Sequence, residues 1–308
     1  MITTPVKFPS FAKINWILRV LGKRPDGYHE VVTVLQTISL HDELTIKLSE
    51  NGPIKLTCDD PTIPTGLREN LVTRAVEYLQ DGFQQWVGAE IHLKKRIPAM
   101  GGLGGASSNA AVTLKALNKL WQGAYIDVEE FGPECLGADV PFFLVGGRCA
   151  ATGIGEVLTP LDDCPKQYLI IITPNAKVST ADAYASLNAA ALTTSDSVSI
   201  LSSSLADLNH ADSRQWRLRN DFERVIFEIE PEIERAKNAL LEAGAWGALL
   251  AGSGSSVFGV FDGRVERNRG LMDLKSEAGW RVIACETISR DEYVRAMNSS
   301  GIPLFTLS

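Results

Sequence analysis

One stretch of the sequence combines glycines with hydroxyl side chains directly before a predicted helix. It runs Pro98-Ala-Met-Gly-Gly-Leu-Gly-Gly-Ala-Ser-Ser108. Backbone N–H groups without side chains, placed where a helix dipole is positive, form an anion site, and a phosphate is the expected guest. Ser107 and Ser108 add hydroxyls of the kind that bind Mg²⁺. The loop lacks the lysine of a Walker A loop, and a tight turn with a serine helix cap is the alternative.

Two ionisable side chains stand in apolar surroundings. Lys13 and Asn15 share one face of a predicted strand, about 7 Å apart. A buried ammonium needs an anionic partner, and Asp139, followed by Val-Pro-Phe-Phe143, needs a cation for the same reason. The two residues are therefore candidates to pair. The alternatives are an exposed strand face for Lys13 and a helix N-cap for Asp139.

Two further segments contain residues that could bind a ligand. Gly252-Ser253-Gly254 lies in a small-residue turn between two predicted strands. Glycines at such a place indicate close approach of the backbone to a ligand or to another backbone segment. Either it is a plain turn, or it forms the second side of a phosphate cleft with the first loop. Tyr28 and His29 follow a Pro-Asp-Gly turn and combine a ring for stacking with an imidazole that donates and accepts hydrogen bonds. A purely structural histidine is the alternative there.

The elements that must position these residues follow from hydrophobic periodicity. Alternation predicts a strand with Ile14, Trp16, Leu18 and Val20 on one face and Lys13, Asn15, Ile17 and Arg19 on the other. Further strands are predicted at 31–38, 44–48, 89–94, 148–152, 168–173, 246–250 and 257–261. Helices are predicted at 69–81, 110–121, 127–135, 220–230 and 232–243, the third ended or kinked by Pro133 and the last two split by Pro231. The Ser/Thr-rich stretch 193–204 is predicted to be a solvated loop.

Composition bounds the class of protein. A chain of 308 residues suggests two domains or one large one, and the second half opens near residue 165. Thirty Lys+Arg against 37 Asp+Glu leave a net charge of −7, which speaks against a nucleic-acid partner. The densest basic cluster, Lys94-Lys95-Arg96, therefore needs a local explanation.

The cysteines and the hydropathy pattern indicate where in the cell the protein is expected. Five cysteines are an odd number, with no CxxC pair, which favours free thiols in a reducing cytoplasm over disulfides or a structural metal. No window approaches 18 uncharged apolar residues, so we expect no membrane span. Oligomeric state, monomer or homodimer, stays open.

Four blocks in a fixed order resemble motifs of the GHMP small-molecule kinases: residues 10–15, 98–108, 137–141 and 251–256. Together with residues 24–29, they are similar to the branch that phosphorylates a cytidine-diphosphate-linked methylerythritol in the non-mevalonate route to isoprenoids. The resemblance covers residues 8 to 262. It implies a two-domain α+β fold, with an N-terminal ATP domain (1–164), a C-terminal ferredoxin-like domain (165–308) and the active site in the cleft between them.

The resemblance also implies roles. It implies ATP and Mg²⁺, a small-molecule substrate with a cytidine diphosphate group, and transfer to the tertiary 2-hydroxyl, with Asp139 as the catalytic residue and Lys13 as its partner. The triphosphate cradle would be formed by Pro98, Ala99, Met100, Gly101, Gly102, Leu103, Gly104, Gly105, Ala106, Ser107 and Ser108. Asn70 and Lys95 match positions near adenine. Substrate-binding positions would be Asn15, Tyr28, His29, Tyr184, Gly252, Ser253 and Gly254, and Ser107 or Ser108 would bind the metal.

Two other functions are compatible with the same motifs. One is a GHMP kinase for another alcohol, such as homoserine or mevalonate, whose substrate has no base to stack on Tyr28 and His29. The other is a non-catalytic nucleotide-binding regulator, which would not need both Lys13 and Asp139. The loop also departs from the family pattern, with Ala106 where glycine is common and Asn109 where aspartate is common.

Overall fold

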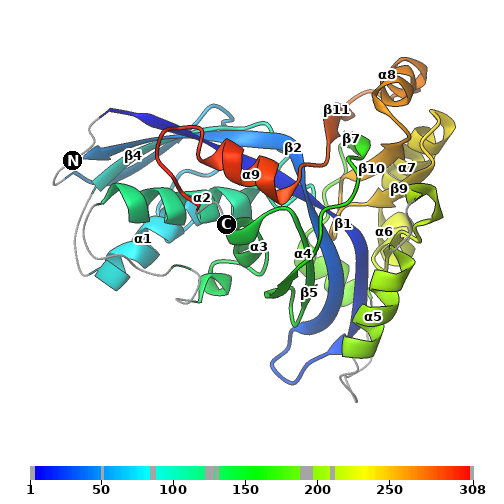
Figure 1. The fold of residues 1–308 in the computed structure, drawn as a ribbon, viewed down its shortest axis with the longest axis horizontal. Helices are drawn as coiled ribbons and strands as arrows, with labels where there is room; N and C mark the ends of the chain where they lie inside the picture. Colours follow the sequence, from blue (N-terminus) through cyan, green and yellow to red (C-terminus); the bar gives the residue numbers. More distant parts are fainter. Residues whose placement is uncertain are drawn as a thin grey trace.

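The computed structural model describes residues 4–49, 52–83, 88–121, 128, 132–187, 197–208 and 212–305. The described residues form two sheets, each with helices packed against it. Two long N-terminal strands of the first sheet run across the molecule toward the second (Figure 1). The α+β class expected from the sequence is confirmed. None of the described helices is long and apolar enough to cross a bilayer.

The first sheet has seven strands in the described part of the chain. They are β1 (Val6–Lys23), β2 (His29–Ser49), β3 (Ile54–Cys58), β4 (Gly88–Lys94), β5 (Arg148–Thr152), β6 (Val157–Pro160) and β8 (Arg219–Asn220). Their order is β3-β4-β2-β1-β8, with β5 beside β2 and β6 beside β5. The two strands predicted at 31–38 and 44–48 are one continuous strand, β2, which pairs with β5 through residues 33–36 and with β4 through residues 43–49.

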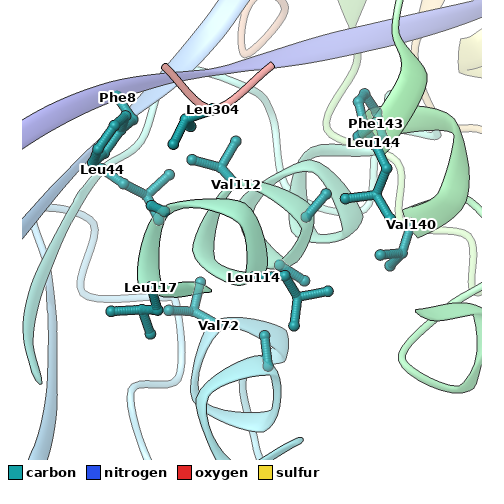
Figure 2. Packing of buried hydrophobic residues seen from close by; sticks show 14 of the residues in the cluster. Phe8, Leu44, Val72, Val112, Leu114, Leu117, Val140, Phe143, Leu144 and Leu304 are labelled. Carbon is teal, nitrogen blue, oxygen red and sulfur yellow. The ribbon is translucent and has the colours of Figure 1, made fainter. Parts of the chain in front are cut away.

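Helices on one side of this sheet build the largest core. They are α1 (Leu71–Phe83), α2 (Gly105–Leu120) and α3 (Val140–Val145), and α9 (Arg290–Met297) joins the same core from the other end of the chain. Figure 2 shows Leu304 packed beside Val112 of α2, opposite Phe8 and Leu44 of the sheet. Of the helix predicted at 127–135, residues 127 and 129–131 lie outside the described residues. Among the described ones, Pro133–Cys135 form a short 3-10 helix, η1.

The second sheet has the topology of a ferredoxin-like domain. Its strands are β7 (Tyr168–Thr173), β9 (Gly247–Leu250), β10 (Val257–Phe261) and β11 (Arg281–Glu286), all antiparallel in the order β11-β7-β10-β9. Helices connect β7 to β9 and β10 to β11, and a short turn connects β9 to β10, which is the split βαβ arrangement. The accompanying elements are α4 (Thr180–Ser186), α5 (Ser197–Asp207), η2 (Ser213–Gln215), α6 (Glu223–Ile229), α7 (Pro231–Glu242) and α8 (Arg264–Asp273). The boundary at residue 165 stays a prediction.

The solvated loop predicted over 193–204 is wrong in its described part. Residues 197–207 form α5, and Leu205 of this helix and Leu208, directly after its end, pack in the core between the sheets. Two of the serine hydroxyls are satisfied within the helix, since Ser202 Oγ donates to the Val198 carbonyl at 3.0 Å and Ser203 Oγ to the Ile200 carbonyl at 2.9 Å. The leucines are the signal that the high serine content obscured.

The strand that carries Lys13 does not alternate as the sequence predicts. Its pairing with β2 shifts by one residue between Asn15 and Ile17, which leaves Trp16 as the extra residue of a β-bulge. Beyond the bulge the phase of β1 is reversed. Leu18 therefore lines the same cavity as Lys13 and Asn15, and Ile17 packs with Trp16 in the core between the sheets.

A buried carboxylate fixes the chain just before the glycine-rich loop. Asp42 of β2 is fully buried and accepts hydrogen bonds from Lys95 Nζ (2.5 Å), the Arg96 and Ile97 backbone N–H groups (2.6 and 2.8 Å) and Asn109 Nδ2 (3.0 Å). These contacts tie β2 to the segment that enters the loop and to α2. They also provide a local role for the Lys94-Lys95-Arg96 cluster.

We expect Asp42→Ala to lower the free energy of unfolding by about 3–5 kcal/mol, because it leaves the Lys95 ammonium buried without its partner. Glu43→Ala is the matched control on the next residue. It removes an exposed ion pair with Lys7 (3.1 Å), for which the expected loss is below about 1 kcal/mol. Urea unfolding measures both, and equal losses would contradict the anchoring role of Asp42.

Candidate active site

A cavity of about 880 Å³ lies where the two sheets meet. Its lining comes from β1, β2, the glycine-rich loop, the segment before α3, α4 and the turn between β9 and β10. Predicted site residues in the lining are Lys13, Asn15, Tyr28, His29, Met100, Gly102, Gly104, Gly105, Ala106, Ser107, Asp139, Tyr184, Gly252 and Ser253. One cavity therefore collects residues that are up to 240 positions apart, as Lys13 and Ser253 are.

Lys13 and Asp139 form an ion pair in this cavity. Lys13 Nζ lies 3.5 Å from Asp139 Oδ2, with the lysine side chain 5% exposed and the aspartate side chain 34% exposed. The exposed-face alternative for Lys13 is therefore wrong. Asp139 does stand at the N-cap position of α3, but among the described contacts its side chain accepts no hydrogen bond from that helix. Its carboxylate pairs with Lys13 and lines the cavity.

The two small-residue loops lie against each other. Ser255 N donates to the Met100 carbonyl and Ser256 N to the Gly101 carbonyl, both at 3.2 Å. Gly102 has φ of 72°, and a side chain there would collide with the Ala251 carbonyl oxygen. The structure thus brings the loops together as two sides of one cleft, as the sequence indicated.

The glycine-rich loop is also seated on the strand of Lys13. The Lys13 N–H donates to the Leu103 carbonyl at 3.0 Å. A Cβ at Gly104, the N-cap residue of α2, would lie 2.8 Å from the Phe143 ring and 3.0 Å from Lys13 Cγ. Glycine is required at this position because φ is 73° and the helix N-terminus packs against the Phe143 ring and the aliphatic part of Lys13.

The two serines of the loop face different surroundings. Ser108 is fully buried, and its Oγ accepts a hydrogen bond from Ser10 Oγ at 2.8 Å. Ser107 lines the cavity and lies beside Gly137, where a Cβ would be 3.4 Å from Ser107 Oγ. Neither serine is the helix cap, since that position belongs to Gly104. Ser107 is the one placed to meet a ligand.

Aromatic rings line another part of the cavity. His29 stacks on Tyr184 with centroids 4.8 Å apart, and Phe222 meets the Tyr184 ring edge-on, also at 4.8 Å. Tyr28 lines the same cavity with 61% of its surface exposed, which leaves its ring available to a planar ligand. Burial first and Lys23 second lower the pKa of His29, so the imidazole is neutral at pH 7. Burial, and then Asp139, raise the pKa of Tyr184 to about 12, so its hydroxyl stays a donor.

Asn70 and Lys95 are not in the cavity lining. Asn70 directly precedes α1, where its Oδ1 accepts from the Val72 N–H at 2.9 Å, and Lys95 is bound to Asp42. One turn after Asn70, Arg74 does line the cavity and donates to the Cys135 carbonyl at 3.4 Å. A role for Asn70 and Lys95 near adenine stays a prediction.

Sequence reasoning missed several residues of the site. Thr33, Phe222 and Arg74 line the cavity, and Asn220 holds it together by donating from Nδ2 to the Leu250 and Gly252 carbonyls at 2.9 and 2.7 Å. Threonine in a strand and phenylalanine at a helix start are ordinary residues there. Only the pairing of distant strands brings them to the site.

Comparisons with known proteins agree with this geometry. The model of the GHMP kinases N terminal domain matches residues 70–147, and the model of the GHMP kinases C terminal domain matches residues 197–275. A 4-diphosphocytidyl-2-C-methyl-D-erythritol kinase of Citrifermentans bemidjiense is 39% identical over 279 residues, 90% of this chain and 97% of the relative. One of Pelotomaculum thermopropionicum is 43% identical over 251 residues, 81% of this chain and 86% of the relative.

Solved structures show the same fold. A crystal structure of 4-(cytidine 5'-diphospho)-2C-methyl-D-erythritol kinase superposes with a TM-score of 0.73 at 33% identity, covering 91% of this chain and 98% of that one. Homoserine kinase from Cytophaga hutchinsonii superposes with a TM-score of 0.70 at 19% identity, covering 94% of this chain and 96% of that one. At that identity the second match shows the fold alone.

We expect Gly102→Ala to lower both nucleotide affinity and Tm, because its methyl group would push the two loops apart. Gly244→Ala is the matched control, since Gly244 also has positive φ (94°) but has open space around its Cβ position. Backbone strain alone is worth about 1–2 kcal/mol. Calorimetric ATP titration and thermal melts measure the difference, and identical behaviour of the two variants would show that the contact between the loops is not required.

We expect the NMR titration of His29 to have its midpoint below 6.5, with Lys23→Gln moving the midpoint upward but not to 6.5, because burial is the larger cause. The folded pKa is the lower one, so the contribution of His29 to stability is present above pH 6.5. It is lost as pH falls through the folded pKa. A His29 midpoint above 6.5 would refute the assignment.

Proposed function

Because the chain belongs to the 4-diphosphocytidyl-2-C-methyl-D-erythritol kinase family of the GHMP kinases, we propose that Lys13 and Asp139 perform its phosphoryl transfer. The chain catalyses the ATP-dependent phosphorylation of 4-diphosphocytidyl-2-C-methyl-D-erythritol in the non-mevalonate route to isoprenoids. The observation that carries the residue assignment is the Lys13–Asp139 ion pair. It lies in the same cavity as the glycine-rich loop and the aromatic rings of His29 and Tyr184.

In the proposed step, the Asp139 carboxylate accepts the proton of the substrate's tertiary 2-hydroxyl as that oxygen attacks the γ-phosphorus of ATP. The bond between the γ-phosphorus and the β–γ bridging oxygen breaks, and ADP leaves with that oxygen. The Lys13 ammonium, 3.5 Å from Asp139, holds the carboxylate in place and stabilises the charge that develops on the transferred group. Aspartate therefore acts as the base and lysine keeps its protons.

Neutral backbone groups provide the phosphate cradle. The loop from Gly101 to Gly105 leads into the positive end of α2, and the turn at Gly252 closes the opposite side. A Cβ at Gly252 would lie 3.3 Å from Lys13 Nζ, so the turn stands over the ammonium. The transferred phosphate is placed between these dipoles and the lysine.

The donor set fits a magnesium ion that arrives with ATP. Mg²⁺ takes one or two protein oxygens together with phosphate oxygens and waters, and the Ser107 hydroxyl faces the cavity near the segment that carries Asp139. Among the described residues no group of three or more His, Cys, Asp or Glu side chains forms a metal cage. Ser107 would hold the ion, which when bound neutralises charge on the β- and γ-phosphates.

The aromatic rings favour a substrate with a base. We propose that Tyr28 and Tyr184 stack on the cytosine and that the neutral His29 hydrogen-bonds its edge. Homoserine and mevalonate offer no ring to these side chains. A non-catalytic regulator would have no use for a carboxylate held beside a buried lysine.

A coupled ADP-release assay over a panel of alcohols tests the function. We expect substrate-dependent ADP release with 4-diphosphocytidyl-2-C-methyl-D-erythritol and none with homoserine or mevalonate. Asp139→Asn should lower kcat by at least about 10²-fold with ATP binding retained, since a positioned base is typically worth 10²–10⁴-fold. Asp262→Asn, which alters an exposed pair with Arg214 outside the cavity, is the control.

Three outcomes would contradict parts of the proposal. Turnover of homoserine or mevalonate alone would refute the substrate. ATP binding without ADP release on any alcohol would favour the regulator. Near-normal turnover in Asp139→Asn would remove Asp139 from the role of base.

A further inference from the structure

We propose that Thr33 is a positioning residue for phosphoryl transfer, because its hydroxyl orients the Asn15 amide so that the amide oxygen faces the Lys13 ammonium. This inference rests on the proposed function, in which Lys13 acts on the transferred phosphate. Thr33 lies on β2, lines the cavity and is buried next to Asn15. It has no part in the motifs that the sequence offers.

The direction of each hydrogen bond follows from the donors available. A threonine hydroxyl has one proton, and Thr33 Oγ1 donates it to the Ile17 carbonyl at 2.7 Å. Toward Asn15 the same oxygen can only accept, and Asn15 Nδ2 donates to it at 2.7 Å. The amide oxygen must then point the other way, where Asn15 Oδ1 accepts from Lys13 Nζ at 2.9 Å. One hydroxyl thus determines which end of the amide meets the ammonium.

The Ile17 carbonyl is a fixed reference point for this series of bonds. Ile17 directly follows the bulge in β1, and it also pairs with Arg219 of β8. The β1 pairing beyond the bulge places Leu18, rather than Ile17, opposite Thr33. Because strands on both sides hold this part of β1, its carbonyl cannot rotate toward another donor.

The orientation of the Asn15 amide matters because the amide and its partners are buried. Over the whole residue, Thr33, Asn15 and Lys13 are each at most 4% exposed, so a lost partner is poorly replaced by water. A reversed amide would direct its N–H donors at the ammonium and remove the nearer of its two described partners, which leaves only Asp139 Oδ2 at 3.5 Å. Lys13 would then shift relative to Asp139 and to the Gly252 turn that stands over it.

The expected defect is in the chemical step. Thr33 reaches neither the phosphate loop nor the aromatic rings through its described hydrogen bonds, which go to Ile17 and Asn15. Displacing the lysine affects charge stabilisation at the transferred phosphate more than ground-state binding. A shift of about 1 Å in a catalytic group can lower a rate by about 10²-fold.

The test compares Thr33→Val with Thr37→Val. Thr37 lies on the same strand and is fully buried, and its hydroxyl has no hydrogen-bond partner among the described residues. We expect Thr33→Val to lower kcat by about 10- to 100-fold with KM for both substrates within about threefold. Thr37→Val should keep kcat within about twofold, and Thr33→Ser, which restores the hydroxyl, should recover most of the rate.

A double variant separates positioning from a general structural role. If Thr33 acts through Asn15, adding Thr33→Val to Asn15→Ala should lower kcat no further than Asn15→Ala alone. Additive losses would overturn the proposal, and so would a Thr33→Val rate within twofold of Thr37→Val. Thr33→Ala is made in parallel, and failure of both Thr33 variants to fold would assign the hydroxyl to the fold and overturn the positioning role. An inactive wild-type enzyme would instead refute the proposed function.

Discussion

The burial of the Lys13 ammonium is the constraint on which the rest of the site depends. A charge removed from water to this extent costs several kcal/mol unless it is paired and hydrogen-bonded. One partner, Asn15, is local and lies on the same strand, whereas the other, Asp139 at the start of α3, reaches Lys13 only through the fold. The fold must therefore hold β1 and α3 in fixed relation. It does so because β1 contributes side chains to all three hydrophobic cores, as Phe8, Trp16 and Leu18 show.

The same constraint explains how an acidic chain can handle a triphosphate. With a net charge of −7, the protein as a whole repels polyanions. Attraction in the cleft is local, from backbone dipoles at the start of α2, from one buried lysine and from the small residues that let these approach each other. The charge that would otherwise repel the phosphates is kept away from the loop by pairing, as in the bond between Asp42 and Lys95.

Much of the fold and the key pair could be predicted because their signals are local. Glycines before a helix and a carboxylate in an apolar run reveal their chemistry without a partner in view. The bulge at Trp16 could not be predicted, since it depends on how β1 meets two neighbouring strands. Thr33 was missed for the same reason: its function exists only through the register with β1. Helix α5 was missed because its serines outnumber the leucines that determine its packing.

The segment that contains α9 and Leu304 determines when the first core can form during synthesis. Tyr293 of α9 is fully buried in the first core and donates to the Phe143 carbonyl at 2.5 Å, and Leu304 packs beside α2. Synthesis therefore has to reach residue 304 before the nucleotide-binding half can complete its interior. The core of the half that is synthesised first is completed only when these late residues pack into it. Until then its apolar surface stays exposed and needs protection from aggregation.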